Sequence, residues 1–319
     1  MIIVKAPFRV SLFGGSTDYK NFYEEYGSFM IGMPIDKYCY ISMRSRPKIL
    51  SKQYLCTYSI YDLVDTLEEL KNPLIRETLK YYDVKDPIEL FSFSDIPYRT
   101  GLGGSSSYCI AMSYAINMLR QEEIYSKRII NSAIKIEREI LKESGGIQDQ
   151  IWPFAKGLSS IQVEKSGDFF IRPLPITEEF EKELEDSMLL IYTEEQRNSD
   201  QIAKSHENDL NNKLEILQMA KDAYGYFLKE DLESIGKLVY ESWLHKEKIS
   251  PYISTGKIKT IIDDVIKMGA YGAKLLGSGG CGFVLAICNP IVKQNIIEKY
   301  KESILDFKID KTGVTTIYE

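Results

Sequence analysis

Residues 97–108 read PYRTGLGGSSSY and place three glycines ahead of three consecutive serines. The stretch follows residues 88–94 (IELFSFS), which predict a strand, and it opens an apolar segment that predicts a helix over residues 105–120. Free backbone N–H groups and the positive dipole end of a helix start can bind phosphate, and serine hydroxyls there can ligate Mg²⁺. A plain turn with an N-cap serine is the alternative. No lysine follows the last glycine, so this is not a Walker loop.

The composition of the whole chain indicates a globular protein of about two domains. It has 319 residues, of which 44% are hydrophobic and 27% charged. The net charge of −6 argues against a nucleic-acid partner. Five scattered cysteines and two histidines argue against a disulfide framework and a structural zinc site, and instead predict buried thiols in a reducing cytoplasm. We find no signal peptide and no apolar run of about 18 residues, so we expect no membrane partner.

The predicted elements mix strands and helices, which favours an α+β fold over a parallel doubly wound sheet. A strand over residues 2–13 puts Lys5 and Arg9 on the face opposite its apolar residues. A two-proline stretch at 172–177, RPLPIT, is a plausible boundary that divides the chain into domains 1–175 and 176–319. The other expected elements are a strand pair at 31–46, a hairpin at 158–172, a strand at 186–193, several helices within 195–268, a strand, glycine loop and strand at 273–288, a helix near 291–301 and a last strand.

A strongly amphipathic pattern predicts one helix over residues 126–143. With a step of about 100° per residue, Glu137 falls in the middle of the apolar sector, whereas Arg138 and Glu139 fall outside it. A carboxylate in an apolar stripe is costly unless it is paired or bound to a metal. Periodicity alone therefore leaves Glu137 as either a metal ligand or one half of a buried ion pair.

Two further stretches contain residue types suited to substrate binding. Residues 145–154, GGIQDQIWPF, place Asp149 after a Gly-Gly turn, where it can approach a substrate hydroxyl or act as a turn or cap residue. Residues 274–287, KLLGSGGCGFVLAI, interrupt two apolar strands with four glycines. Glycines at this density favour either close approach of another group to the backbone or a structural bulge.

Taken together, these stretches resemble the GHMP kinase family, which includes galactokinases, homoserine kinases and mevalonate kinases. The family's glycine loop reads P-x₃-G-L-G-S-S-A, and residues 97–106 read PYRTGLGGSS. Galactokinases carry A-P-G-R-V-N-L-I-G-E-H-T-D-Y, and residues 6–19 read APFRVSLFGGSTDY. The family's C-terminal glycine motif matches residues 274–284. The motifs occur in the family's order and span nearly the whole chain.

The resemblance implies a ribosomal-protein-S5-like N-terminal domain and a ferredoxin-like C-terminal domain, with ATP and Mg²⁺ in the cleft between them. In the family pattern, Asp149 is the catalytic residue and Arg9 faces the reacting hydroxyl, while Ser105 and Glu137 bind Mg²⁺. The residues implied to bind ATP are Gly101, Leu102, Gly103, Gly104, Ser105, Ser106, Ser107, Gly277, Gly279 and Gly280. Those implied to bind the acceptor are Gly14, Gly15, Ser16, Thr17 and Asp18.

Two departures from the galactokinase pattern bear on the substrate. Phe8 replaces the usual glycine, and Gly15-Ser16 replace a Glu-His pair whose carboxylate contacts the 6-hydroxyl of the sugar. The loss of this carboxylate opens room for a larger, anionic substituent at C6. The three motifs FGGSTDY, GLGGSSS and GGIQDQ look most like those of bacterial D-glycero-D-manno-heptose 7-phosphate kinases. These phosphorylate the anomeric hydroxyl to give a 1,7-bisphosphate for GDP-heptose and surface-polysaccharide synthesis.

We therefore expect an ATP-dependent phosphotransferase whose partner is a small sugar phosphate. Arg197 is the first candidate to bind the 7-phosphate, and Arg99 is the second. Two alternatives stay open: a kinase for an unphosphorylated sugar such as fucose or galactose, and a catalytically inactive sugar-binding relative. The presence of Glu137, Asp149 and both glycine loops argues against the inactive relative. A homodimer is a further open expectation.

Overall fold

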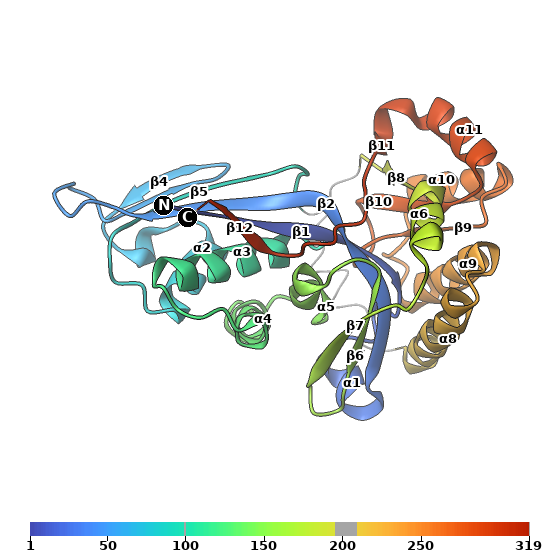
Figure 1. Cartoon of the computed structure of the whole chain (residues 1–319), viewed down its shortest axis with the longest axis horizontal. Helices are drawn as coiled ribbons and strands as arrows, with labels where there is room; N and C mark the ends of the chain where they lie inside the picture. Colours follow the sequence, from blue (N-terminus) through green and yellow to red (C-terminus); the bar gives the residue numbers. More distant parts are fainter. Residues whose placement is uncertain (99, 195–208, 319) are drawn as a thin grey trace.

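The computed structural model describes residues 1–98, 100–194 and 209–318, which form two sheets with helices packed on them (Figure 1). The larger sheet has the order β12-β1-β2-β5-β3-β4, and β6 and β7 extend it from β2. Its strands are β1 (Ile2–Phe13), β2 (Ser28–Ser45), β3 (Tyr54–Thr57), β4 (Tyr61–Val64), β5 (Ile88–Ser94), β6 (Ser159–Val163), β7 (Phe169–Pro173) and β12 (Thr315–Tyr318). The smaller sheet is β11 (Ile304–Leu305), β8 (Met188–Tyr192), β10 (Phe283–Ile287) and β9 (Gly272–Leu275), in that order.

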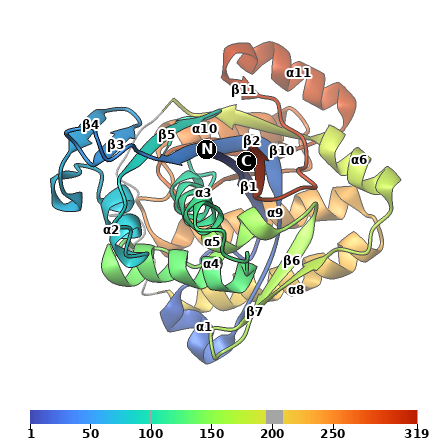
Figure 2. The ribbon, with the colours of Figure 1, turned by 60° about the vertical axis from the view of Figure 1, so that its left-hand side comes forward.

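Helix α3 (Gly104–Leu119) packs against β1 and β2 and lies at the centre of the larger half of the molecule (Figure 2). Its residues Ile110, Ala111 and Ala115 are fully buried against the sheet. The other helices of this half are α1 (Lys20–Tyr26), η1 (Leu67–Glu69), α2 (Pro73–Tyr81), α4 (Ser126–Ile134), η2 (Lys135–Ile140), α5 (Gln148–Ile151) and η3 (Trp152–Phe154). Those around the smaller sheet are α6 (Glu178–Ser187), α8 (Leu210–Leu228), α9 (Leu232–Ile249), α10 (Gly256–Lys267), α11 (Pro290–Tyr300) and η5 (Lys301–Ser303).

Strands β1 and β2 are irregular near the middle of their pairing, and this irregularity positions Arg9. The register shifts between Pro7 and Phe8, immediately before Arg9. Residues 39–45 of β2 pair with β5, whereas residues 28–32 pair with β6. A bulge of this kind bends the strand and redirects side chains. The strand pair predicted over residues 31–46 is therefore wrong, because the chain passes through the Pro34–Lys37 region as one bent strand rather than turning back.

The helix predicted over residues 126–143 is regular only as far as Ile134. Residues 135–140 form a π-helical turn, in which Leu141 N donates to Ile136 O at 2.9 Å. A π turn holds more residues than an α turn, so a constant step of 100° fails beyond Ile134. Ile140 is consequently 39% exposed although the pattern places it in the apolar sector. Glu137 is nevertheless buried, as its position in the pattern predicts.

The remaining elements agree with the sequence pattern. The helix at 105–120, the hairpin at 158–172, and the strands at 186–193 and 273–288 are all present within a residue or two. The five cysteines are buried and free, as expected. The last strand, β12, pairs with β1, so the two chain ends lie close together (Figure 1).

The division of the chain into two domains at residue 175 stays a prediction. Within the described ranges, no helix combines the length and apolar character needed to cross a membrane.

Candidate active site

A cavity of about 630 Å³ is lined by residues of both halves of the molecule. Both glycine loops, the segment after β1 and the turn before α5 contribute to its wall. The predicted site residues that line it are Arg9, Gly15, Ser16, Asp18, Gly101, Gly103, Gly104, Ser105, Ser106, Glu137, Asp149, Gly277 and Gly279. The fold thus brings together three motifs that lie far apart in the sequence.

Some residues expected to contact ligand do not line this cavity and instead shape its loops. They are Gly14, Thr17, Leu102, Ser107 and Gly280. The Thr17 hydroxyl donates to Gly14 O at 2.7 Å and closes the turn after β1. The Ser107 hydroxyl donates to Pro7 O at 2.8 Å, and Leu102 is fully buried in the core. The side chains of Thr17, Leu102 and Ser107 are therefore engaged within the protein.

Helix α3 begins on the cavity wall. Gly103 precedes it in the left-handed conformation, with φ of 79°, and no side chain caps this end of the helix. The first bond inside the helix runs from Ser107 N to Gly103 O at 3.0 Å. The amides of residues 104–106 thus have no partner within the helix, which suits the binding of phosphate. A Cβ at Gly104 would lie 2.6 Å from the Phe8 ring, so packing also requires glycine there.

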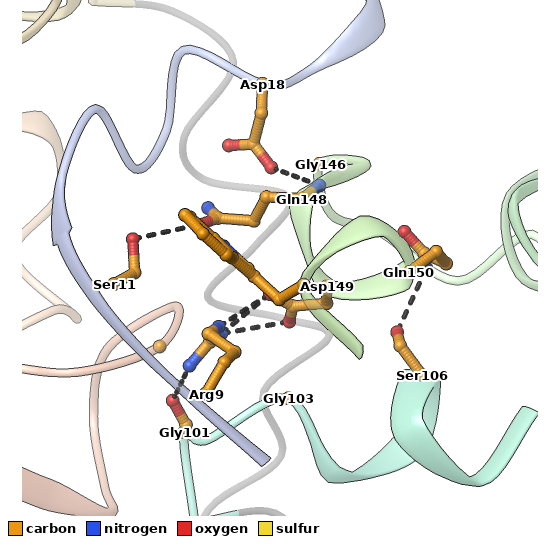
Figure 3. Close-up of polar contacts among 12 residues, drawn as sticks. Arg9, Ser11, Asp18, Gly101, Gly103, Ser106, Gly146, Gln148, Asp149 and Gln150 are labelled. Atoms are coloured by element: carbon orange, nitrogen blue, oxygen red, sulfur yellow. Dashed lines mark hydrogen bonds and ion pairs between the residues drawn. The ribbon is translucent and has the colours of Figure 1, made fainter. Parts of the chain in front are cut away.

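Arg9 and Asp149 form a bidentate ion pair on the wall of the cavity (Figure 3). Arg9 Nε donates to Asp149 Oδ1 at 2.8 Å, and a terminal guanidinium nitrogen donates to Oδ2 at 3.0 Å. The second terminal nitrogen of Arg9 donates to Gly101 O at 2.6 Å and ties the pair to the glycine loop. Arg9 is only 4% exposed, whereas the Asp149 side chain is 26% exposed. The carboxylate is thus held in one orientation and still accessible from the cavity.

Asp18 is buried on the same wall beside the turn that leads into α5. Its Oδ2 accepts a bond from the backbone N–H of Gln148 at 3.0 Å, while Oδ1 has no hydrogen-bond partner. A Cβ at Gly146 would lie 1.9 Å from Oδ2, so only glycine permits this approach. Burial raises the pKa of the Asp18 carboxyl; the Gln148 amide opposes this shift and Asp149 adds to it. The unpartnered oxygen is suited to accept a bond from a hydroxyl group of a ligand.

The Gln148 side chain connects this region to β1. Its Oε1 accepts bonds from the Ser11 hydroxyl at 2.8 Å and from the indole N–H of Trp152 at 3.2 Å. The amide orientation is fixed by these two donors, so the Nε2 group is directed toward Gly15, where a Cβ would lie 3.7 Å away. Sequence reasoning did not single out Ser11 or Gln148, because neither stands out by charge or periodicity.

Glu137 is 1% exposed and is linked to α3 through Gln150. Its Oε2 accepts a bond from Gln150 Nε2 at 2.5 Å, and the same Nε2 donates to the Ser106 hydroxyl at 3.0 Å. Oε1 is buried without a hydrogen-bond partner, and no basic side chain of the described residues pairs with Glu137. The ion-pair alternative is therefore not observed. A free carboxylate oxygen on the cavity wall fits Mg²⁺, which prefers one or two carboxylates together with substrate phosphates and water.

The second glycine loop packs directly on the first. A Cβ at Gly277 would lie 2.5 Å from the Cα of Gly101, and one at Gly282 would lie 2.2 Å from Thr100 O. Gly279 makes a similar approach to Ile253. The sequence indicates that another group approaches the backbone at these glycines. In the structure, other backbone segments of the same chain make this approach. This contact closes the cavity between the two halves of the molecule.

Two buried lysines on the cavity wall were not expected from the sequence. Lys246 on α9 donates to Gly277 O, and Lys274 on β9 donates to Leu12 O at 2.9 Å. Lys246 lies on the buried face of its helix, so the periodicity that identifies Glu137 could also have identified Lys246.

The two arginines expected to bind a sugar phosphate, Arg99 and Arg197, lie outside the described residues.

Part of the cavity lining is apolar or aromatic and comes from the turn between β3 and β4, the start of α2 and the segment before α3. This part consists of Tyr58, Ile60, Pro73, Leu74 and Tyr98. Apolar and aromatic walls of this kind can hold a planar ring system such as a nucleobase. The cavity therefore combines an apolar region, an uncapped helix start, a carboxylate suited to Mg²⁺ and a carboxylate–guanidinium pair.

Comparison with known proteins identifies matches over both halves of the chain. The model for the GHMP kinases N terminal domain matches residues 66–157, and the model for the GHMP kinases C terminal domain matches residues 223–304. The chain is 26% identical to a D-glycero-alpha-D-manno-heptose 7-phosphate kinase of Campylobacter jejuni, with 98% of each chain covered. It is 27% identical to a mevalonate kinase of Methanocaldococcus jannaschii over 73% of each. A crystal structure of a D-glycero-D-manno-heptose 1-phosphate kinase from Bacteroides thetaiotaomicron has a TM-score of 0.83, 21% identity and full coverage of both chains.

Proposed function

The chain belongs to the GHMP kinase family and is thus an ATP-dependent kinase, and from this premise we propose that its acceptor is D-glycero-D-manno-heptose 7-phosphate. The reaction transfers the γ-phosphoryl group of ATP to the anomeric hydroxyl and yields the 1,7-bisphosphate and ADP. The likeness to the Campylobacter enzyme over nearly the full length of both chains supports a sugar as acceptor. A place in GDP-heptose and surface-polysaccharide synthesis rests on the same likeness.

The Arg9–Asp149 pair is the observation that most strongly supports phosphoryl transfer at this site. It lies beside the uncapped start of α3, since a Cβ at Gly103 would be 3.6 Å from both Arg9 Nε and Asp149 Cγ. A phosphate bound to the helix start would therefore lie next to the carboxylate that receives the acceptor hydroxyl. Phosphoryl transfer requires mainly this kind of positioning and charge stabilisation.

Asp149 orients the acceptor hydroxyl and accepts its proton as the oxygen attacks the γ-phosphorus. Each carboxylate oxygen can accept more than one hydrogen bond, so pairing with Arg9 leaves lone pairs for the substrate. The O–P bond to the sugar forms as the bond between the γ-phosphorus and the β–γ bridging oxygen breaks, and ADP leaves. The guanidinium of Arg9 lies where it can stabilise the negative charge that develops on the transferring group.

Glu137, with Ser105 on the same wall, would hold Mg²⁺ through its unpartnered Oε1. When bound, the ion neutralises charge on the β- and γ-phosphates. The described residues contain no group of three or more His, Cys, Asp or Glu side chains suited to a metal, so the remaining ligands would be phosphate oxygens and water.

The proposed function is tested by ATP consumption with a panel of acceptors. We expect turnover with D-glycero-D-manno-heptose 7-phosphate and a product with a new anomeric phosphate, which ³¹P NMR identifies. The panel includes the same heptose without phosphate, fucose and galactose. Turnover of a free sugar as efficient as that of the heptose phosphate would favour the unphosphorylated-sugar alternative. ATP binding without turnover of any acceptor would favour an inactive relative.

Changing Gly15→Glu should reduce the preference for a phosphorylated acceptor. The backbone at Gly15 has no positive φ, and a Cβ there would meet nothing closer than 3.7 Å, so the variant should fold normally. The new carboxylate would repel a phosphate and fill the space beside the acceptor. We expect kcat/KM for the heptose phosphate to fall by roughly 10- to 100-fold, as for the loss of one charge-assisted contact. The matched control, Gly15→Gln, fills the same space without the charge.

A further inference from the structure

Lys246 and Lys274 are the two buried cations of the cavity wall that have no carboxylate partner among the described residues. Their exposed fractions are 7% and 5%. Lys246 donates to Gly277 O and Lys274 to Leu12 O, and neither appears in any ion pair of the described part of the chain. An ammonium group has three N–H donors, so each lysine has donors left for a ligand. The two groups come from α9 and β9 and line the same cavity.

Burial of a cation without a counter-ion is unfavourable, so an anion in the cavity would stabilise both lysines. Arg9 cannot supply such compensation, because it carries the same charge and is itself paired with Asp149. We propose that Lys246 and Lys274 together bind the phosphate monoester that the acceptor sugar carries. This inference rests on the proposed function and names residues for the part of the substrate that the expected arginines, Arg99 and Arg197, would otherwise hold.

The positions of the lysines favour the acceptor's phosphate over the phosphates of ATP. Lys274 lies 2.9 Å from Leu12 O, next to Ser11. Figure 3 shows Ser11 and Gln148 on one side of Asp149 and Ser106, at the start of α3, on the other. Arg9, Asp18 and Asp149 all contribute to the pKa of Lys246, so these charged groups lie near its ammonium. Lys274 thus lies on the acceptor side of the cavity, and Lys246, which is bonded to Gly277 O, is close enough to Lys274 to lower its pKa.

The electrostatics of the site predict how acceptor binding depends on pH. Burial lowers the pKa of Lys246 to about 8; Arg9 lowers it further, and Asp18 and Asp149 partly oppose the shift. Burial also lowers the pKa of Lys274 well below its usual range, with contributions from Lys246 and Arg9. A phosphate monoester gains its second charge above about pH 6. We therefore expect KM for the heptose phosphate to rise as the pH increases through about 8, where Lys246 loses its proton, while KM for ATP stays nearly constant.

The direct test compares Lys246→Met and Lys274→Met with Lys248→Met, which removes the same charge from an exposed position of α9. We expect KM for the heptose 7-phosphate to rise roughly 10- to 100-fold in each cavity variant, as for one charge-assisted contact, with KM for ATP within about two-fold. Lys246→Arg should restore part of the affinity. A rise in KM for ATP alone would overturn the proposal, as would unchanged constants with a lowered Tm, which would indicate a purely structural role.

A second measurement separates this proposal from the choice of sugar. Inorganic phosphate is titrated into protein saturated with Mg²⁺ and a non-hydrolysable ATP analogue, and Tm is recorded. We expect phosphate to raise Tm of the native protein and of Lys248→Met but not of the Lys246→Met/Lys274→Met double variant. This result, together with no turnover of the heptose phosphate, would keep the anion site and reject only the proposed sugar. Equal stabilisation of all variants by phosphate would overturn the anion site.

Discussion

Asp149→Asn should lower kcat by about 10²–10⁴-fold, the range for a positioned acid–base group, while the affinity for ATP changes little. Asparagine keeps the shape of the side chain and can still accept a bond from Arg9 through its amide oxygen. It lacks the negative charge and the second acceptor that the carboxylate offers in the pair, where two Arg9 nitrogens lie 2.8 and 3.0 Å from the two oxygens. Steady-state kinetics with the heptose phosphate, together with ATP binding by calorimetry, measure the two effects separately.

The control for this prediction is Asp306→Asn, the same change at an exposed aspartate whose side chain has no partner within the described ranges. It should keep kcat within about two-fold. Because Arg9 is 4% exposed, Asp149→Asn also leaves a buried guanidinium with a weaker partner, so some loss of stability is expected. Kinetics are therefore compared at a temperature where both variants are folded. An Asp149→Asn enzyme within a few-fold of the native kcat would exclude Asp149 as the proton acceptor.

The sequence predicts features that depend on local periodicity. Glu137 is found because a helical step places it among isoleucines, and its burial follows even though the helix changes to a π turn at Lys135. Lys246 lies on an equally regular stripe with Val239 and Trp243, so the same reasoning applied to residues 232–249 would have identified it. Lys274 could not be found this way, because β9 has only four residues, too few to show a periodic pattern, and all four are buried.

Features that depend on contacts between distant segments could not be predicted from local patterns. Arg9 and Asp149 are separated by 140 residues, and only the resemblance to a family suggested that they share a site. The same holds for the contact of Gly101 with Gly277, since each loop alone suggests a ligand rather than the other loop. The sequence predicts a strand pair over residues 31–46 instead of the single bent strand β2. A polar break within a strand looks the same in sequence whether the chain turns back or continues through a bulge.

Glu137→Gln should reduce kcat/KM by about 10²–10³-fold at low Mg²⁺ and shift the Mg²⁺ activation curve to higher concentration, in the range for losing one charge that stabilises the transition state. Glutamine has nearly the same size, and its amide oxygen can still accept the bond from Gln150 that Oε2 now accepts at 2.5 Å. The effect should therefore come from the loss of charge at Oε1, which has no hydrogen-bond partner among the residues that the structure describes. The value of kcat/KM for ATP is measured as a function of Mg²⁺, from initial rates at varied ATP and saturating acceptor.

Thermal stability distinguishes the two roles considered for Glu137, which are a metal ligand and one half of a buried ion pair. Removing one partner of such a pair typically costs about 3–5 kcal/mol. No cation of the described residues pairs with Glu137, and burying an ionised carboxylate without one is itself unfavourable. Tm of Glu137→Gln without Mg²⁺ should thus equal or exceed that of the native protein. Addition of Mg²⁺ with an ATP analogue should then raise Tm more for the native protein than for the variant.

The matched control is Glu139→Gln, two residues further along the same turn, where the side chain is exposed. It removes the same charge from the same π turn but does not line the cavity, so Mg²⁺ activation and Tm should both match the native protein. If Glu137→Gln instead lowered Tm sharply and left the Mg²⁺ dependence unchanged, Glu137 would have a structural role. The carboxylate that helical periodicity singles out would then stabilise the packing around Gln150 and Ser106 rather than bind the metal that accompanies ATP.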